Sequence, residues 1–172
     1  MIKQLSLLVF IVLLNACDED DHVHTEREYP PALLSFDVVD SYGTNSEFDL
    51  DPLYLNPYRF DGEFELFWSV DANGPYRVEF ILNTSPEVEG GALLSSAWCG
   101  RGYSCDNHSY QYCYYKPTLS IHCERPQSSQ LNPRADVAGI VRTLPGAYFI
   151  VAEVCDQDLL YCETASRRIV ME

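Results

Sequence analysis

Apolar and polar residues alternate along two neighbouring stretches of the chain, residues 63–70 and 76–83. A period of two with many aromatic residues is typical of a strand that buries one face. Between them, Asp71 to Pro75 contains Asn73-Gly74, a pair typical of turns. The pattern therefore predicts two strands that pair as a hairpin. The residues expected on its buried face are Phe64, Leu66, Trp68, Val70, Tyr76, Val78, Phe80 and Leu82.

Further strands are predicted before and after this pair. Leu34, Phe36 and Val38 alternate with polar neighbours and predict a first strand. The stretch 48–60 is interrupted by prolines, which are tolerated at sheet edges, and predicts an edge strand. No segment places apolar residues at helical spacing, so the expected fold class is all-β.

The C-terminus carries the clearest strand pattern. Residues 148–155 form a β-rich run, residues 156–161 form a connection, and residues 162–171 return. This hairpin follows Leu144-Pro145-Gly146 and resembles the closing hairpin of immunoglobulin-like sandwiches, particularly fibronectin type III and PKD-type domains. The resemblance implies an antiparallel β-sandwich, in which the Tyr148 hydroxyl bonds back to upstream backbone as a tyrosine corner.

The first seventeen residues have the layout of a secretory signal. Lys3 precedes an apolar run at 7–14, which is too short for the roughly 20 apolar residues of a membrane-spanning helix. The sequence Leu14-Asn15-Ala16-Cys17 resembles the lipobox of bacterial lipoproteins, with a less usual Asn15 in second place. The resemblance implies cleavage before Cys17 and a lipid on its sulfur, which anchors the protein to a membrane. The alternative is an ordinary secretory signal beside an unrelated cysteine.

Three segments follow from these patterns. Residues 1–16 are expected to be a lipoprotein signal peptide, 17–32 an acidic tether, and 33–172 one β-sandwich domain. The expected location is the bacterial cell envelope, with the domain in the periplasm or at the cell surface. Asp18 resembles a signal for retention in the inner membrane, whereas the acidic run after Cys17 resembles a surface-export signal, so both membranes stay open.

The charge balance narrows the range of partners. Without residues 1–16 the chain has 10 basic and 26 acidic residues, a formal net charge of −16. Such a surface repels nucleic acid and anionic headgroups, so no nucleic-acid partner is expected. No twelve-residue calcium loop is present, and neither a metal site nor a cofactor is predicted.

The cysteines support an oxidising compartment. When Cys17 is assigned to lipid, six cysteines remain, an even number that predicts three disulfides. Zinc is the competing explanation, but no Cys-x-x-Cys pair occurs. The six residues are Cys99, Cys105, Cys113, Cys123, Cys155 and Cys162.

Strand geometry favours one set of pairs. Cys155 and Cys162 flank a six-residue connection, so they face each other at the end of a hairpin. Cys113 faces Cys123 if the loop between their strands is the three-residue Pro117–Leu119, but not if it is a two-residue turn at 116–117. Cys99 and Cys105 are then left to pair with each other.

Catalytic motifs are missing from the chain. Its four histidines are His22, His24, His108 and His122, and none belongs to a recognisable triad, nucleophile elbow or zinc motif. Catalysis needs a nucleophile or metal with an oriented base. The sequence therefore predicts a protein that is not an enzyme.

A tyrosine-rich insertion at 98–123 offers the candidate binding surface. Alternation places Tyr110, Tyr112 and Tyr114 on one face of a strand and points Tyr115 the other way. Such residues either pack within the sandwich or present rigid rings to a partner. The candidate surface residues are Trp98, Tyr103, Tyr110, Tyr112 and Tyr114. The predicted function is a lipid-anchored interaction or structural module of the envelope; the alternative is a glycan-binding or adhesion protein that uses this insertion.

Overall fold

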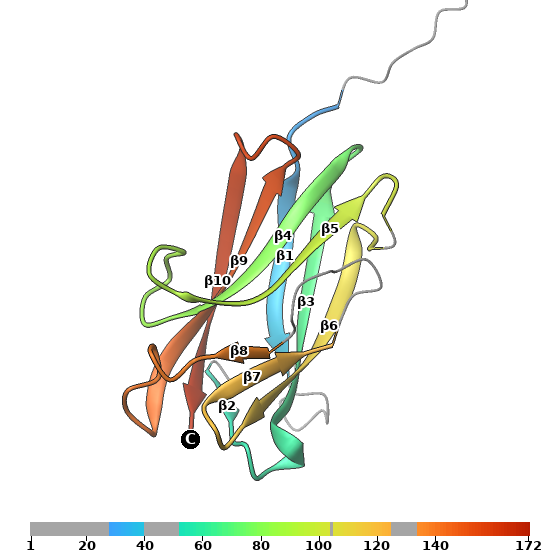
Figure 1. Cartoon of the computed structure of the whole chain (residues 1–172). Coiled ribbons are helices and arrows are strands. Elements are labelled where there is room, and N and C mark those ends of the chain that lie inside the picture. Colours follow the sequence, from blue (N-terminus) through green and yellow to red (C-terminus); the bar gives the residue numbers. More distant parts are fainter. Residues whose placement is uncertain (1–27, 40–51, 104, 125–133) are drawn as a thin grey trace, which may run out of the picture.

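The computed structural model describes residues 28–39, 52–103, 105–124 and 134–172, which form two five-stranded sheets packed face to face (Figure 1). The first sheet has the order β1-β3-β6-β7-β8 and the second β2-β10-β9-β4-β5. The first contains β1 (Ala32–Val39), β3 (Glu63–Asp71), β6 (His108–Lys116), β7 (Ser120–Cys123) and β8 (Arg134–Asp136). The second contains β2 (Leu53–Leu55), β4 (Pro75–Asn83), β5 (Ala92–Gly100), β9 (Gly146–Asp156) and β10 (Cys162–Met171). A single 3-10 turn, η1 (Phe60–Gly62), precedes β3.

The predicted all-β sandwich is confirmed, with one departure from an antiparallel arrangement. The edge strand expected within 48–60 is β2, and it runs parallel to β10, pairing Leu53 with Ile169 and Leu55 with Met171. This register buries all four side chains in the core. Burial therefore outweighs the slightly weaker hydrogen bonding of a parallel pair. Residues 48–51 lie outside the described part of the chain.

Alternation in β3 and β4 places their apolar residues in the core, as predicted. Phe64, Leu66, Trp68 and Val70 of β3 are buried, and so are Tyr76, Val78, Phe80 and Leu82 of β4. The rings of Trp68 and Phe80 meet with their centroids 5.1 Å apart, and the Phe36 ring of β1 stacks on Phe80 at 5.8 Å. These contacts join the two sheets.

The predicted pairing of these two strands as a hairpin is wrong. β3 lies between β1 and β6 in the first sheet, whereas β4 lies between β9 and β5 in the second. The connection Ala72–Gly74 crosses from one sheet to the other, a distance of about 10 Å that three residues can span. Crossing lets both apolar faces point into the same core from opposite sides.

The first strand is confirmed as β1, but a bulge changes its inward-facing residues. The pairing with β3 shifts between Leu33 and Ser35, so Leu34 points to solvent while Phe36 and Val38 remain buried. Leu33 packs against the core in its place. An extra residue in one strand moves the side chains that precede it to the opposite face of the sheet.

The C-terminal hairpin is confirmed as β9 and β10, with Cys155 opposite Cys162. The Tyr148 hydroxyl donates a hydrogen bond to the Thr143 carbonyl oxygen at 2.8 Å and accepts one from the Thr143 N–H at 3.3 Å. This is the backbone contact expected of a tyrosine corner. A Cβ added at Gly146 would lie 2.8 Å from the Tyr148 hydroxyl, so glycine leaves room for it.

Three disulfides join the predicted pairs, Cys99–Cys105, Cys113–Cys123 and Cys155–Cys162. Strands β6 and β7 pair Lys116 with Ser120, so the loop between them is the three-residue Pro117–Leu119. The choice left open by the sequence is thus resolved for this hairpin.

The expected signal peptide, Cys17, His22 and His24 lie outside the described residues. Within the described residues, no helix is long and apolar enough to cross a bilayer.

Candidate functional site

An aromatic strip lies on the outer face of the first sheet and is formed by Phe67 of β3 with Tyr110, Tyr112 and Tyr114 of β6. Phe67 and Tyr110 are opposite each other in the register, and their ring centroids are 5.9 Å apart. Tyr110 and Tyr112 meet edge to face at 5.5 Å. Phe67 is 40% exposed and Tyr110 57% exposed, so the strip presents rings to solvent.

Strand parity places the strip outside the core. Tyr110, Tyr112 and Tyr114 alternate with Gln111, Cys113 and Tyr115, which are all buried. Tyr115 points inward, as the sequence predicts, and its hydroxyl has no hydrogen-bond partner among the described residues. Burial raises the pKa of the Tyr115 phenol above its usual value.

Acidic residues edge the aromatic strip. Glu65 lies opposite Tyr112 and Glu63 opposite Tyr114 in the register of β3 and β6. The negative charge of Glu65 is the main cause that raises the pKa of the Tyr112 phenol above its usual value. At the other end, the Lys116 ammonium lies 5.0 Å from the centre of the Tyr114 ring, and the Tyr114 hydroxyl donates to Glu124 at 3.0 Å. Charged side chains thus hold Tyr114, whereas Tyr110 contacts the rings of Phe67 and Tyr112.

The other two candidate residues lie elsewhere. Trp98 is on β5 of the second sheet, where it is partly buried opposite Arg77. Its ring stacks on that of Tyr103 with centroids 6.0 Å apart and an interplanar angle of 24°. The structure therefore divides the tyrosine-rich insertion into two sites, the aromatic strip and a Trp98–Tyr103 pair.

An open cleft of about 720 Å³ adjoins Tyr103 at one end of the sandwich. Its polar lining comes from the β3–β4 connection, the β5–β6 loop and the first residue of β6. These residues are Asn73, Arg101, Tyr103, Asp106, Asn107 and His108.

The loop that forms the cleft is held at several points. The Cys99–Cys105 disulfide closes it, and the Gly100 N–H donates to the Cys105 carbonyl at 2.8 Å. Asn107 donates from its amide nitrogen to the Ala72 carbonyl at 2.8 Å, which ties the loop to the opposite wall. Gly100 has φ +81°, and a Cβ there would meet the Gly74 carbonyl oxygen, so glycine is required at this approach. These contacts hold the described residues of the loop against the β3–β4 connection.

A serine and a histidine meet between the strip and the cleft. The Ser69 hydroxyl lies 2.7 Å from His108 Nδ1, across the register of β3 and β6. A nucleophile beside a base is the first element of acyl-transfer sites, which also need a group that orients the base. Across residues 28–39, 52–103, 105–124 and 134–172, no carboxylate contacts the His108 ring. His122 lies apart from this pair, opposite Tyr114.

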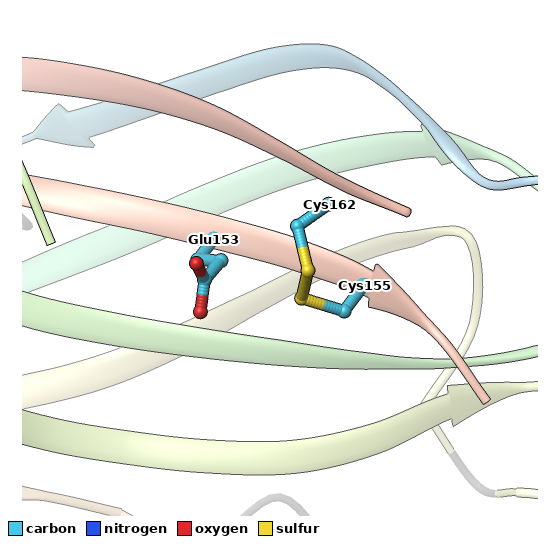
Figure 2. Close-up of side chains that lie close together, drawn as sticks. All are labelled: Glu153, Cys155 and Cys162. Carbon is cyan, nitrogen blue, oxygen red and sulfur yellow. A yellow bond between two sulfur atoms is a disulfide. The ribbon is translucent and has the colours of Figure 1, made fainter. Parts of the chain in front are cut away.

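One further cluster contains potential metal ligands, Glu153 with Cys155 and Cys162, whose ligand atoms lie within 4.8 Å of one another (Figure 2). Metals bind cysteine as the thiolate. Both sulfur atoms are joined in a disulfide, so only the Glu153 carboxylate is available to a cation in this state.

Comparison with known proteins gives no match: no protein-family model, curated protein or solved structure is similar to this chain.

Proposed function

We propose that this protein is a lipid-anchored, non-enzymatic interaction module of the bacterial cell envelope, and that it binds a protein partner through the aromatic strip. The lipobox-like sequence at 14–17 supports the anchor, and the three disulfides suit an oxidising compartment. The observation that carries the proposal is the exposed contact of Phe67 with Tyr110 on the outer face of the first sheet.

Rings of this kind are suited to recognition because they offer large apolar area with few rotatable bonds. The strip belongs to strands of nine residues each, so its backbone is fixed before a partner arrives. Glu63 and Glu65 border the strip, and the whole chain is strongly acidic. The complementary partner surface therefore has an apolar centre with basic residues around it.

The test compares two variants in capture from solubilised envelopes. Phe67→Ala with Tyr110→Ala removes the exposed rings, while Tyr54→Ala removes a ring of similar exposure from β2 of the other sheet. We expect the double variant to lose a partner that the wild type and Tyr54→Ala both retain, with little change in melting temperature. Equal capture by all three proteins would refute a binding role for the strip.

The second candidate function is glycan binding at the end cleft. The observation that favours it is the Trp98–Tyr103 stack beside the cleft, which contains Asn73, Arg101 and Asp106. An aromatic ring with a few convergent polar groups suits the apolar and hydroxyl faces of a sugar. Titration calorimetry with envelope oligosaccharides tests this function: a heat of binding that Tyr103→Ala removes supports the cleft, and no heat with any of them argues against it.

A further inference from the structure

The connection between β9 and β10 ends in three consecutive apolar residues that face solvent. Leu159 is 44% exposed, Leu160 76% and Tyr161 62%. We propose that this apolar tip, Leu159–Tyr161, inserts into the interfacial region of the bilayer that anchors the protein. The inference rests on the proposed lipidation of Cys17, and adds to it a second, protein-borne contact with the membrane.

The tip is held in place rather than left to collapse onto the domain. The Asp156 carboxylate accepts hydrogen bonds from the N–H groups of Leu160 and Tyr161, at 2.8 and 3.2 Å. The Asp156 N–H donates to the Tyr161 carbonyl at 3.0 Å, and the Cys155–Cys162 disulfide closes the base. A membrane contact made by this loop needs little further ordering.

The backbone of the tip adopts a conformation that leucine rarely takes. Leu159 has φ +59°, in the left-handed region that favours glycine or asparagine. A glycine at this position would ease the turn without adding apolar surface. Instead the chain carries leucine at 159 and a second exposed leucine at 160.

The tip lies at the end of the sandwich from which the tether leaves. The Leu33 N–H donates to the Glu163 carboxylate at 2.7 Å, so the start of β1 adjoins the start of β10. The Tyr29 hydroxyl donates to Asp71 at 2.7 Å at the same end. Figure 1 shows the β9–β10 loop beside the point where the N-terminal segment meets β1.

Tether length limits how far this end can lie from an anchor on Cys17. Cys17 and Glu28 are eleven residues apart, which limits their separation to about 40 Å even in a fully extended chain. The ten residues of β10 add about 33 Å between the tip and the opposite end of the domain. The upper limit on the distance from an anchor on Cys17 is therefore smaller for the tip than for Tyr58, which follows β2 at the far end.

The side chains of the tip match a zwitterionic bilayer surface. Leucine favours the boundary of the acyl chains, and tyrosine favours the headgroup level, where its ring is buried and its hydroxyl is hydrated. Asp158 is exposed in the same loop and disfavours anionic headgroups. The Asp156 carboxylate is already bound to backbone N–H groups of the loop.

Depth-dependent quenching tests the contact. The full lipidated chain is reconstituted in phosphatidylcholine vesicles with brominated acyl chains, as wild type, Tyr161→Trp and Tyr58→Trp. Tyr58 is 84% exposed and marks the far end. After subtraction of the wild-type signal from Trp68 and Trp98, we expect quenching in Tyr161→Trp and none in Tyr58→Trp. Adding Leu160→Ser to Tyr161→Trp should lower the ratio of inserted to free loop about tenfold, because the variant loses the free energy gained by burying a leucine side chain.

The outcomes separate this inference from the proposed function. Wild-type protein that floats with the vesicles, together with an unquenched Tyr161→Trp, would overturn the inference and leave the lipid anchor intact. Wild-type protein that does not float at all would overturn the lipid anchor and, with it, the membrane contact.

Discussion

Replacing tyrosine by phenylalanine should have opposite effects on stability at two positions of the sandwich. Tyr148 uses its hydroxyl for two hydrogen bonds with the Thr143 backbone, whereas the buried Tyr115 hydroxyl has no partner among the described residues. Replacing each by phenylalanine removes one oxygen atom and leaves the ring in place. We expect Tyr148→Phe to destabilise the protein and Tyr115→Phe to stabilise it.

The magnitudes follow from what each oxygen contacts. Each hydrogen bond of Tyr148 contributes about 0.5–1.5 kcal/mol, so Tyr148→Phe should lower the free energy of unfolding by about 2 kcal/mol. An unpaired buried hydroxyl costs about 1–3 kcal/mol, so Tyr115→Phe should raise it by about 1 kcal/mol. The two variants should therefore differ by about 3 kcal/mol.

Urea unfolding with the disulfides intact measures this difference. Both variants bury the same surface as the wild type, so their m-values should match and only the midpoints should shift. A Tyr115→Phe variant as unstable as Tyr148→Phe would refute the reasoning, because it would show that the Tyr115 hydroxyl has a partner in solution.

Three other substitutions test separate features of the fold. Gly62→Ala should cost about 2 kcal/mol or more in a urea melt, because Gly62 has φ +71° and a Cβ there would meet the Tyr115 carbonyl oxygen. Burial raises the pKa of the Tyr76 phenol to about 12, above its value of about 10 in the unfolded chain. The raised pKa therefore stabilises the folded state fully below pH 10, and this contribution is lost as the pH rises to about 12. In the wild type the urea midpoint of unfolding should fall over this range, and in Tyr76→Phe it should fall less. Replacing Cys113 and Cys123 together with alanine should lower the stability by about 2–4 kcal/mol, read from the thermal midpoint.

The sequence predicted which residues face the core better than which strands pair. Alternation assigns a face to each residue, and the buried sets of β3 and β4 were predicted correctly. It carries no information about the neighbouring strand, so the short connection at 71–75 indicated a hairpin where the chain crosses between sheets. Cysteines supplied the missing information for β6 with β7 and for β9 with β10, because each disulfide fixes a register.

Strand β5 was not predicted, for a physical reason. Its residues Leu94 to Ala97 are buried on both faces, so the alternation that marks a strand is lost. The pairing with β4 shifts between Ser95 and Leu93, so Leu94 is an extra residue in β5 and further disturbs the pattern. The missing strand also affected the candidate surface. Parity grouped Tyr110, Tyr112 and Tyr114 correctly, but Trp98 could not be assigned to the other sheet because β5 was not predicted.

The most direct test of the proposed function is the intact mass of the protein purified from a bacterial membrane fraction. A lipid-anchored envelope module predicts a chain that begins at Cys17, carries the added mass of a diacylglyceryl group and fatty acid, and contains three disulfides. A chain cleaved elsewhere and recovered from the soluble fraction without added mass would contradict it.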